Sequence, residues 1–272
     1  MSRRPIPLLA GAVLVGIIVL AGLVSLVWTP QSYATVDVSE RFQPPGAQYW
    51  LGTDQLGRDV LTQLMVGARH SLGIALIAVG LGGGIGTLLG LLAAARGGLI
   101  EETVMRLADF SFAFPALLFA IMLASAFGPS LSNAVIAIAF INIPVFTRMA
   151  CASAKQIWSR DYVLAARASA RCTMAIRLDH IMPNIAAVVI VQATIDFAGA
   201  ILVEAALSYL GLGVQPPLPS WGRMLSEAQT LLYLAPQLAI FPGLCIVAAV
   251  LGFNLLGDGL RDLADPRLQE RR

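Results

Sequence analysis

The stretch LGIALIAVGLGGGIGTLLGLLAAA, residues 72–95, contains no charged residue and only one hydroxyl, that of Thr87. A bilayer core of about 30 Å is crossed by roughly 20 predominantly apolar residues in a helix. The stretch therefore predicts a membrane-spanning helix. Five further runs of similar character lie at residues 6–28, 111–128, 131–150, 185–210 and 234–256. We predict an all-α polytopic membrane protein with six transmembrane helices.

The composition of the chain agrees with this class. Hydrophobic residues make up 57% of the sequence, charged residues 12%, and the mean hydropathy is +0.78. Soluble domains carry about 25% charged residues, so a water-facing surface is hard to build here. The net charge of +2 does not favour a nucleic-acid partner, and the three cysteines and two histidines are too scattered to predict a disulfide framework or a metal site.

The positive charges predict an orientation. With the N-terminus in the cytoplasm, fourteen of the 18 Lys and Arg residues fall on the cytoplasmic side; the other four are Arg41, Arg58, Arg69 and Arg223. Because Lys and Arg concentrate in cytoplasmic loops, both termini are predicted to be cytoplasmic. The run 6–28 is longer than the core of a secretory signal, so we favour an uncleaved first helix over a cleaved leader.

The first external segment, residues 29–71, contains the sequence LGTDQLGRD, residues 51–59. Thr53 or Asp54 is a candidate N-cap, and the apolar residues after it share one helical face: Val60, Leu61, Leu64, Met65 and Ala68. We predict a short interfacial helix leading into the second span. We thus divide the chain into residues 1–71, the first helix with this external segment, and residues 72–272, a five-helix core.

Four residues on the external side are candidates for contact with an external partner: Asp54, Arg58, Asp59 and Trp221. The alternative for the three charged residues is that they only cap and solvate the interfacial helix. Trp221 follows Pro216, Pro217 and Pro219 in the segment 211–232, and prolines with an interfacial tryptophan predict an ordered external loop.

The glycines of the second span recur four residues apart, as Gly80/Gly84 and Gly82/Gly86/Gly90. No Lys-Ser or Lys-Thr pair follows them, and their spacing does not match a dinucleotide-binding loop. Small residues at this spacing allow close approach of helices in lipid, so they predict helix packing.

The fifth span carries three polar residues that are candidates for the translocation path: Gln192, Asp196 and Glu204. Gln192, Asp196 and Gly199 share a helical face, and a carboxylate at membrane depth is costly unless it faces the bundle interior or water. Asp196 is therefore either a path residue or a buried carboxylate hydrogen-bonded to neighbouring helices. Glu204 lies nearer the outer interface, where we expect it to be hydrated.

The segment 150–184 is long, cationic and polar, and it lies between two apolar spans. Asp161 is a candidate cap for a helix over 162–172, whose small and apolar residues suit docking into a groove on a partner. The residues alone leave a solvated loop with basic side chains at the membrane surface as an equal alternative.

The sequence DYVLAAR, residues 161–167, with IRLDHIMPN, residues 176–184, resembles the EAA loop of binding-protein-dependent ABC importer permeases. The positions that match the signature are Ala165, Ala166, His180, Ile181, Pro183 and Asn184. Leu164 stands where the family often has Glu, and Ala170 stands where it has Gly. The second departure bears on the tightness of the helix turn and on coupling.

The resemblance extends over nearly the whole chain. The segments LGTD (51–54) with GRD (57–59), ALSYLGLG (206–213) with PP (216–217) and SWG (220–222), and NLLGDGLRD (254–262) with DPR (265–267) resemble the dipeptide/oligopeptide/nickel branch of these permeases. Several motifs in the family's order are far more specific than any one of them.

This resemblance implies a type I ABC importer permease fold in a bacterial inner membrane. It implies a heterodimer with a related permease, two cytoplasmic ATPase subunits and an external solute-binding protein. ATP would be used by the partner ATPases, with no cofactor bound by this chain. The coupling residues carried over from the EAA loop are Asp161, Leu164, Ala165, Ala166, Arg167, Ala170, His180 and Pro183.

The substrate expected from this branch is a dipeptide or oligopeptide, and a nickel or other metal chelate is the alternative. A different class, an ion-coupled secondary transporter, would need coupling carboxylates within the bundle and often has internal repeats. Asp196 is the single deep carboxylate, and we find no repeat. The chain has neither a Walker-type loop nor a catalytic dyad, so we predict a transport subunit that is not itself an enzyme.

Overall fold

The computed structural model describes residues 6–169 and 172–264, which form helices and loops and no β-strand. The prediction of an all-α fold is confirmed. The helices are α1 (Ile6–Val24), α2 (Val60–Arg96), α3 (Gly98–Phe112), α4 (Ala116–Phe127), α5 (Leu131–Trp158), α6 (Asp161–Ala168), α7 (Thr173–Ile176), α8 (Met182–Tyr209), α9 (Trp221–Ala228) and α10 (Gln237–Ala264). A π-helical turn, Arg177–Ile181, joins α7 to α8, and two short 3₁₀ turns lie at Val38–Glu40 and Gln229–Leu231.

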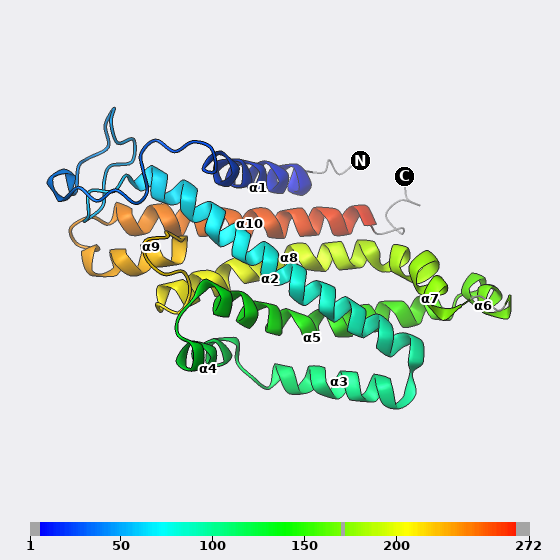
Figure 1. Cartoon of the computed structure of the whole chain (residues 1–272). Helices are drawn as coiled ribbons and strands as arrows, with labels where there is room; N and C mark the ends of the chain where they lie inside the picture. Colours follow the sequence, from blue (N-terminus) through cyan, green and yellow to red (C-terminus); the bar gives the residue numbers. More distant parts are fainter. Residues whose placement is uncertain (1–5, 170–171, 265–272) are drawn as a thin grey trace.

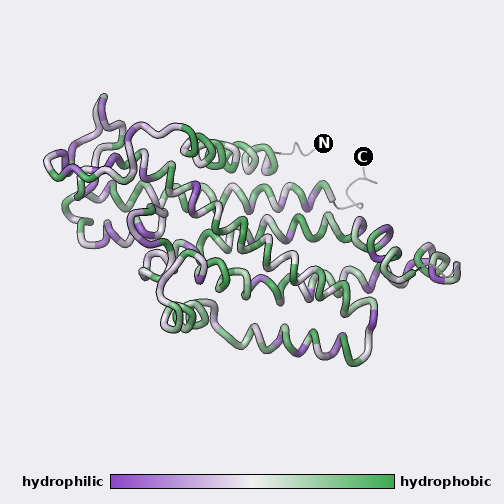
Figure 2. Tube along the Cα trace, in the orientation of Figure 1, coloured by the Kyte–Doolittle hydropathy of each residue, from purple (hydrophilic) through white to green (hydrophobic). Residues whose placement is uncertain are grey.

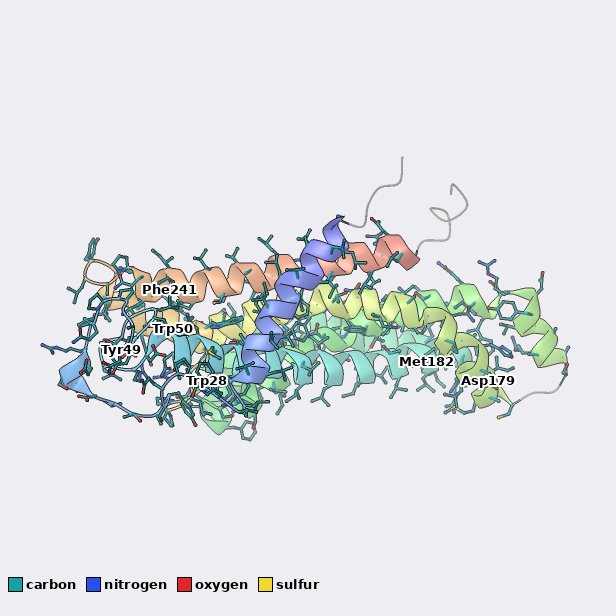
Figure 3. All side chains as sticks on the ribbon, turned by 90° about the horizontal axis from the view of Figure 1, so that it is seen from above. Trp28, Tyr49, Trp50, Asp179, Met182 and Phe241 are labelled. Carbon is teal, nitrogen blue, oxygen red and sulfur yellow. The ribbon has the colours of Figure 1, made fainter. Side chains whose placement is uncertain are left out.

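The long helices form an elongated bundle (Figure 1). Helices α6 and α7 project at one end of it, and α9 lies near the other end with the long segment between α1 and α2. We call these the α6 end and the α9 end. The labelled Trp28, Tyr49 and Trp50 lie toward the α9 end, and Asp179 and Met182 lie toward the α6 end (Figure 3).

Five helical stretches of the described residues are long and apolar enough to cross a membrane, or six if the bent pair α3–α4 counts as one span. This agrees with the predicted polytopic fold. Figure 2 shows apolar residues along the bundle and hydrophilic residues gathered in the loops at its ends. The exposed side chains of α1 are apolar, among them Leu9, Val13, Ile17 and Leu20. These side chains suit a lipid environment.

The predicted continuous span over 111–128 is wrong. Helix α3 ends at Phe112 and α4 begins at Ala116, and the two helices are bent by 84° at this break. Pro115 is the N-cap of α4. Proline has no N–H to donate and disfavours helical geometry at the preceding residue, Phe114, which accounts for the break.

The predicted separate interfacial helix is also wrong. Helix α2 starts at Val60 and continues without interruption to Arg96, across the predicted division at residue 72. Its N-cap is Asp59, whose side chain accepts a 2.8 Å hydrogen bond from the Thr62 backbone N–H, instead of Thr53 or Asp54. The predicted apolar face exists, but Val60, Leu64 and Ala68 are buried in the protein core.

The glycines on one face of α2 allow close packing against another helix, as predicted, but those on the other face do not. A Cβ atom at Gly82, Gly86 or Gly90 would lie 2.5–2.6 Å from a backbone oxygen of α5, so only glycine permits this approach. At Gly80 and Gly84 a Cβ atom would meet nothing within 4 Å. The predicted packing role is confirmed for Gly82, Gly86 and Gly90. Within this chain it is wrong for Gly80 and Gly84.

Candidate functional site

Helix α6 is held to the bundle by a small apolar cluster of its own. Val163 of α6 is fully buried, and it packs with residues from α2, α5, α7, the π-helical turn and α8: Leu91, Ala150, Ala154, Ile176, Ile181 and Ile185. Ala166 is half-buried against the same cluster. This packing orders α6, although eight residues are too few for a stable isolated helix.

The other side of α6 and the residues after it expose large apolar side chains. Tyr162 is 48% exposed, Leu164 46%, Met174 56% and Leu178 57%. Arg167 and Ala165 are exposed beside them. We call the exposed residues Tyr162, Leu164, Ala165, Arg167, Met174 and Leu178 the α6–α7 surface. An exposed group of large apolar side chains rimmed by charge is typical of a protein interaction site.

The predicted coupling residues are distributed over both sides of α6. Leu164, Ala165 and Arg167 belong to the α6–α7 surface, whereas Ala166 faces the core cluster. Asp161 is exposed and is the first residue of α6; the N-cap position is held by Arg160, which corrects the predicted cap. Ala170 lies outside the described residues, so the departure from Gly at that position has no structural account.

The π-helical turn between α7 and α8 contacts α6. The ring of His180, in this turn, meets the ring of Tyr162 of α6 edge-on, with 6.1 Å between ring centroids. Arg167 places its guanidinium 5.8 Å from the Trp158 ring centroid, which ties α6 to α5. Contacts on two sides therefore fix the position of α6 against the bundle.

Pro183, one of the predicted coupling residues, lies in the first turn of α8, where the missing N–H of proline is tolerated. The preceding turn is π-helical: the backbone N–H of Met182 bonds the carbonyl of Arg177, five residues earlier. Such single π turns occur often at functional sites. The segment from Thr173 to Tyr209 forms one helical stretch, so the α6–α7 surface joins directly to the long helix α8.

The predicted path residues separate into two environments on α8. Gln192 Nε2 donates a 3.0 Å hydrogen bond to Asp196 Oδ1, and both side chains are half-buried. Asp196 Oδ2 is buried and has no hydrogen-bond partner. Glu204, two turns nearer the α9 end, is fully buried, so the expectation that it is hydrated is wrong. The packing of α2 and α9 over this part of α8 excludes water from it.

The external candidates form an ion-pair network at the α9 end. Arg58 lies 2.6 Å from Asp54 and 2.6 Å from Glu227 of α9, which in turn lies 2.8 Å from Arg223. Burial opposes the charge of the guanidinium, but the two carboxylates outweigh this effect and raise the pKa of Arg58 above its usual value. The sequence pattern did not predict that Glu227 pairs with Arg58, because the two residues lie far apart in the chain.

The remaining two external candidates are buried. Asp59 is 3% exposed and caps α2, and Trp221 is 1% exposed with its indole N–H donating a 3.1 Å hydrogen bond to the carbonyl of Leu64. Both side chains therefore hold the α9 end together in this conformation. Contact of the Arg58 network with an external partner stays a prediction.

Among the described residues, no group of His, Cys, Asp and Glu side chains has the arrangement of a metal site. Two ion pairs that the sequence pattern did not predict join α3 to α5: Arg148 with Asp109, and Lys155 with Glu101. The side chains of both pairs are partly or largely exposed.

Comparisons with known proteins identify the relatives of this chain. The profile of the family described as "Binding-protein-dependent transport system inner membrane component" matches residues 86–270. The chain is 41% identical over 261 residues to the dipeptide transport system permease protein of Alkalihalophilus pseudofirmus, covering 96% of this chain and 86% of that protein. It is 44% identical over 247 residues to the di/tripeptide transport system permease protein of Pseudomonas aeruginosa, covering 87% and 82%.

A third relative is the glutathione transport system permease protein of Pectobacterium atrosepticum, 38% identical over 264 residues and covering 95% of this chain and 87% of that protein. Among solved structures, a chain of the MetNI methionine ABC transporter in an inward-facing conformation matches with a TM-score of 0.60 and 18% identity. This match covers 73% of this chain and 94% of that one. The two chains are therefore similar in fold as well.

Proposed function

This chain belongs to the family of binding-protein-dependent transport system inner membrane components and is the permease of an ABC importer; we propose that its importer carries short peptides. The observation that carries this proposal is 41–44% identity, over most of the chain, to permeases named for dipeptide and di/tripeptide transport. The relative named for glutathione transport supports the same size class, because glutathione is a tripeptide.

The α6–α7 surface is the proposed docking site of an ATPase subunit. Its exposed apolar side chains, Leu164 and Met174 among them, would be buried in a groove of the partner. The α6 end would then be cytoplasmic, with both termini on that side, as the distribution of Lys and Arg predicts. ATP hydrolysis by the partner supplies the energy, and this chain contributes the path and the mechanical link.

Helix α8 is the proposed mechanical link. It is continuous from Met182, beside the α6–α7 surface, to Tyr209 at the α9 end. A displacement of the docked α6–α7 segment therefore moves a helix that reaches the external loop. The proposed binding protein meets this external loop, and the Arg58 network keeps the loop in a fixed shape.

The proposed path runs along the face of α8 that carries Gln192 and Asp196. Asp196 has one carboxyl oxygen with no partner in the protein, and its neighbour Gly199 leaves the same face open. This oxygen is buried in the present conformation; once exposed in an open path, it can accept hydrogen bonds from the backbone N–H groups or the terminal ammonium of a peptide. A second, related permease would supply the other wall of the path.

Photo-cross-linking tests the docking proposal. A photoreactive amino acid replaces Leu164 in one variant and, as a matched control, Leu99 in another; Leu99 is 82% exposed at the start of α3, near the same end of the bundle. We expect the Leu164 variant to cross-link an ATPase subunit in the co-expressed complex and the Leu99 variant to do so far less. Equal cross-linking at both positions, or none at Leu164, would contradict the docking site.

Competition for uptake tests the substrate class. Cells that depend on this importer are given a labelled dipeptide together with unlabelled tripeptide, glutathione or a nickel chelate. We expect the two peptides to reduce uptake of the label and the nickel chelate to leave it unchanged. The opposite pattern would move the proposal to metal-chelate import while leaving the docking site intact.

A further inference from the structure

Two short turns toward the α9 end consist of large apolar side chains that the protein leaves uncovered. The first follows α1 and contains three exposed residues: Leu26, Val27 and Trp28. The second precedes α10 and contains three more: Leu232, Tyr233 and Leu234. We call them the Trp28 turn and the Tyr233 turn. Val27 is 92% exposed and Tyr233 is fully exposed, so the chain itself covers neither turn.

The backbone of both turns is held in place, so this exposure is a property of the fold. In the Trp28 turn, the Trp28 backbone N–H donates a 2.8 Å hydrogen bond to the carbonyl of Val24. In the Tyr233 turn, the N–H groups of Leu234 and Ala235 donate bonds of 3.0 and 2.8 Å to the carbonyl of Leu231. Ala235 is buried and Leu231 packs against the core. The side chain of Tyr233, between them, is therefore presented outward by an ordered turn.

Each turn lies at the end of an apolar stripe on a helix that is long and apolar enough to cross a membrane. The stripe on α1 recurs every three or four residues and continues into the Trp28 turn: Leu9, Val13, Ile17, Leu20, Val24 and Val27. The stripe on α10 has the same spacing and begins just after the Tyr233 turn: Ile240, Leu244, Val247 and Leu251. The two turns thus extend surfaces that face lipid along the length of the bundle.

The sequence around both turns suits contact with a bilayer. No charged residue lies between Arg4 and Asp37 or between Glu227 and Asp258. A charge in contact with hydrocarbon is costly, and neither segment carries one. Trp and Tyr are enriched where hydrocarbon meets the headgroups, because each ring combines an apolar body with a polar N–H or O–H group.

The size of the side chains favours lipid over a helix of a partner permease. Helices that pack together within a membrane meet through small residues. The two turns contain only Leu, Val, Trp and Tyr, whereas an open face of α2 carries Gly73, Gly80 and Gly84, where a Cβ atom would meet nothing within 4 Å. The face of α2 therefore suits a partner helix better than either turn does.

We propose that the Trp28 turn and the Tyr233 turn are membrane anchors that insert among the phospholipids of the leaflet at the α9 end. In the orientation that the proposed function implies, this is the outer leaflet; the contact with lipid itself does not depend on that orientation or on the substrate. The Trp28 indole N–H and the Tyr233 hydroxyl then bond headgroup or carbonyl oxygens of the lipid.

Both anchors belong to one pair of tightly packed helices. A Cβ atom at Gly11 of α1 would lie 2.6 Å from the backbone nitrogen of Leu256, and one at Gly259 would lie 2.6 Å from Leu8 Cβ. Helices α1 and α10 are thus in direct contact, so the two anchors together set the depth of this pair in the bilayer.

Trp50 provides an internal control. It is as exposed as Trp28, and both lie toward the α9 end (Figure 3). No apolar stripe leads to it, and the residues before it, 43–48, are Gln, Pro, Pro, Gly, Ala and Gln. We expect Trp50 to face water.

Photo-cross-linking to lipid tests the anchors. A photoreactive amino acid replaces Trp28, Tyr233 or, as the control, Trp50 in the complete importer in phospholipid nanodiscs, and mass spectrometry identifies what each position has captured. We expect phospholipid adducts at positions 28 and 233, severalfold more abundant than at position 50. Capture mainly of another protein subunit at 28 or 233, or equal lipid capture at all three positions, would overturn the proposal.

Fluorescence quenching tests the native side chains. The signal of Trp28 is the difference between wild type and W28F, and that of Trp50 is the difference between wild type and W50F. Lipids brominated near the headgroup end of their acyl chains should quench Trp28 and leave Trp50 unchanged, while aqueous iodide should quench Trp50 more strongly. Iodide quenching of Trp28 as strong as that of Trp50 would overturn the proposal and leave the substrate class and the ATPase docking site untouched.

Discussion

Truncation of Leu164 to alanine should weaken the binding of the ATPase subunit by about fivefold. Leu164 is 46% exposed in the free chain. Full burial of a leucine side chain is worth about 1.5–3 kcal/mol, so burying the exposed half on docking contributes about 1 kcal/mol. At 1.4 kcal/mol per tenfold change, that loss corresponds to the fivefold increase in Kd.

A charge at the same position should have a much larger effect. Leu164→Glu would place a carboxylate in an apolar groove, and burying an unpaired charge costs several kcal/mol, so we expect Kd to rise by more than about a hundredfold. The matched control is Leu99→Glu, at an exposed leucine outside the α6–α7 surface.

The assay titrates a labelled ATPase subunit onto the permease pair in nanodiscs and follows fluorescence anisotropy. Size-exclusion profiles and thermal midpoints of all variants show that the fold is intact, since neither leucine belongs to the core. The reasoning is refuted if both Leu164 variants bind within twofold of wild type, or if Leu99→Glu weakens binding as much as Leu164→Glu does.

Three further changes probe other parts of the molecule. Gly86→Leu should abolish recovery of folded protein in fluorescence-detected size exclusion, because its Cβ would lie 2.5 Å from an α5 carbonyl oxygen, while Gly84→Leu, where nothing lies within 4 Å, should be recovered normally. Asp196→Asn should slow peptide uptake in vesicles with unchanged subunit recovery; an unchanged rate would make Asp196 a structural residue. Arg58→Met leaves Asp54 without its cation, while Glu227 keeps Arg223, and it should destabilise the complex by about 2 kcal/mol, seen as a lower thermal midpoint.

The features that the sequence predicted correctly are those set by local composition. Apolar length defines a membrane span regardless of its neighbours, so the bundle was predictable, and the spacing of Gly82, Gly86 and Gly90 predicted close packing. Which partner the glycines meet was not predictable, and Gly80 and Gly84, with the same spacing, face away from α5. A helix has several faces, and only the tertiary arrangement decides which face is covered.

The wrong predictions concern features that depend on single residues or on contacts between distant parts of the chain. The break before Pro115 and the start of α2 at Asp59 depend on backbone hydrogen bonding at single residues, whereas span prediction averages over many residues. Burial of Glu204 and Trp221 depends on contacts between α2, α8 and α9, far apart in the chain. These contacts therefore could not be predicted from the sequence alone.

Uptake by a reconstituted importer tests the central claim most directly. The chain, its partner permease and the ATPase subunits are placed in liposomes, and a labelled dipeptide is offered together with the binding protein on the side of the α9 end. The account predicts uptake that requires ATP on the opposite side and that falls in Leu164→Glu but not in Leu99→Glu. Uptake by this chain alone, driven by an ion gradient without ATP, would contradict it.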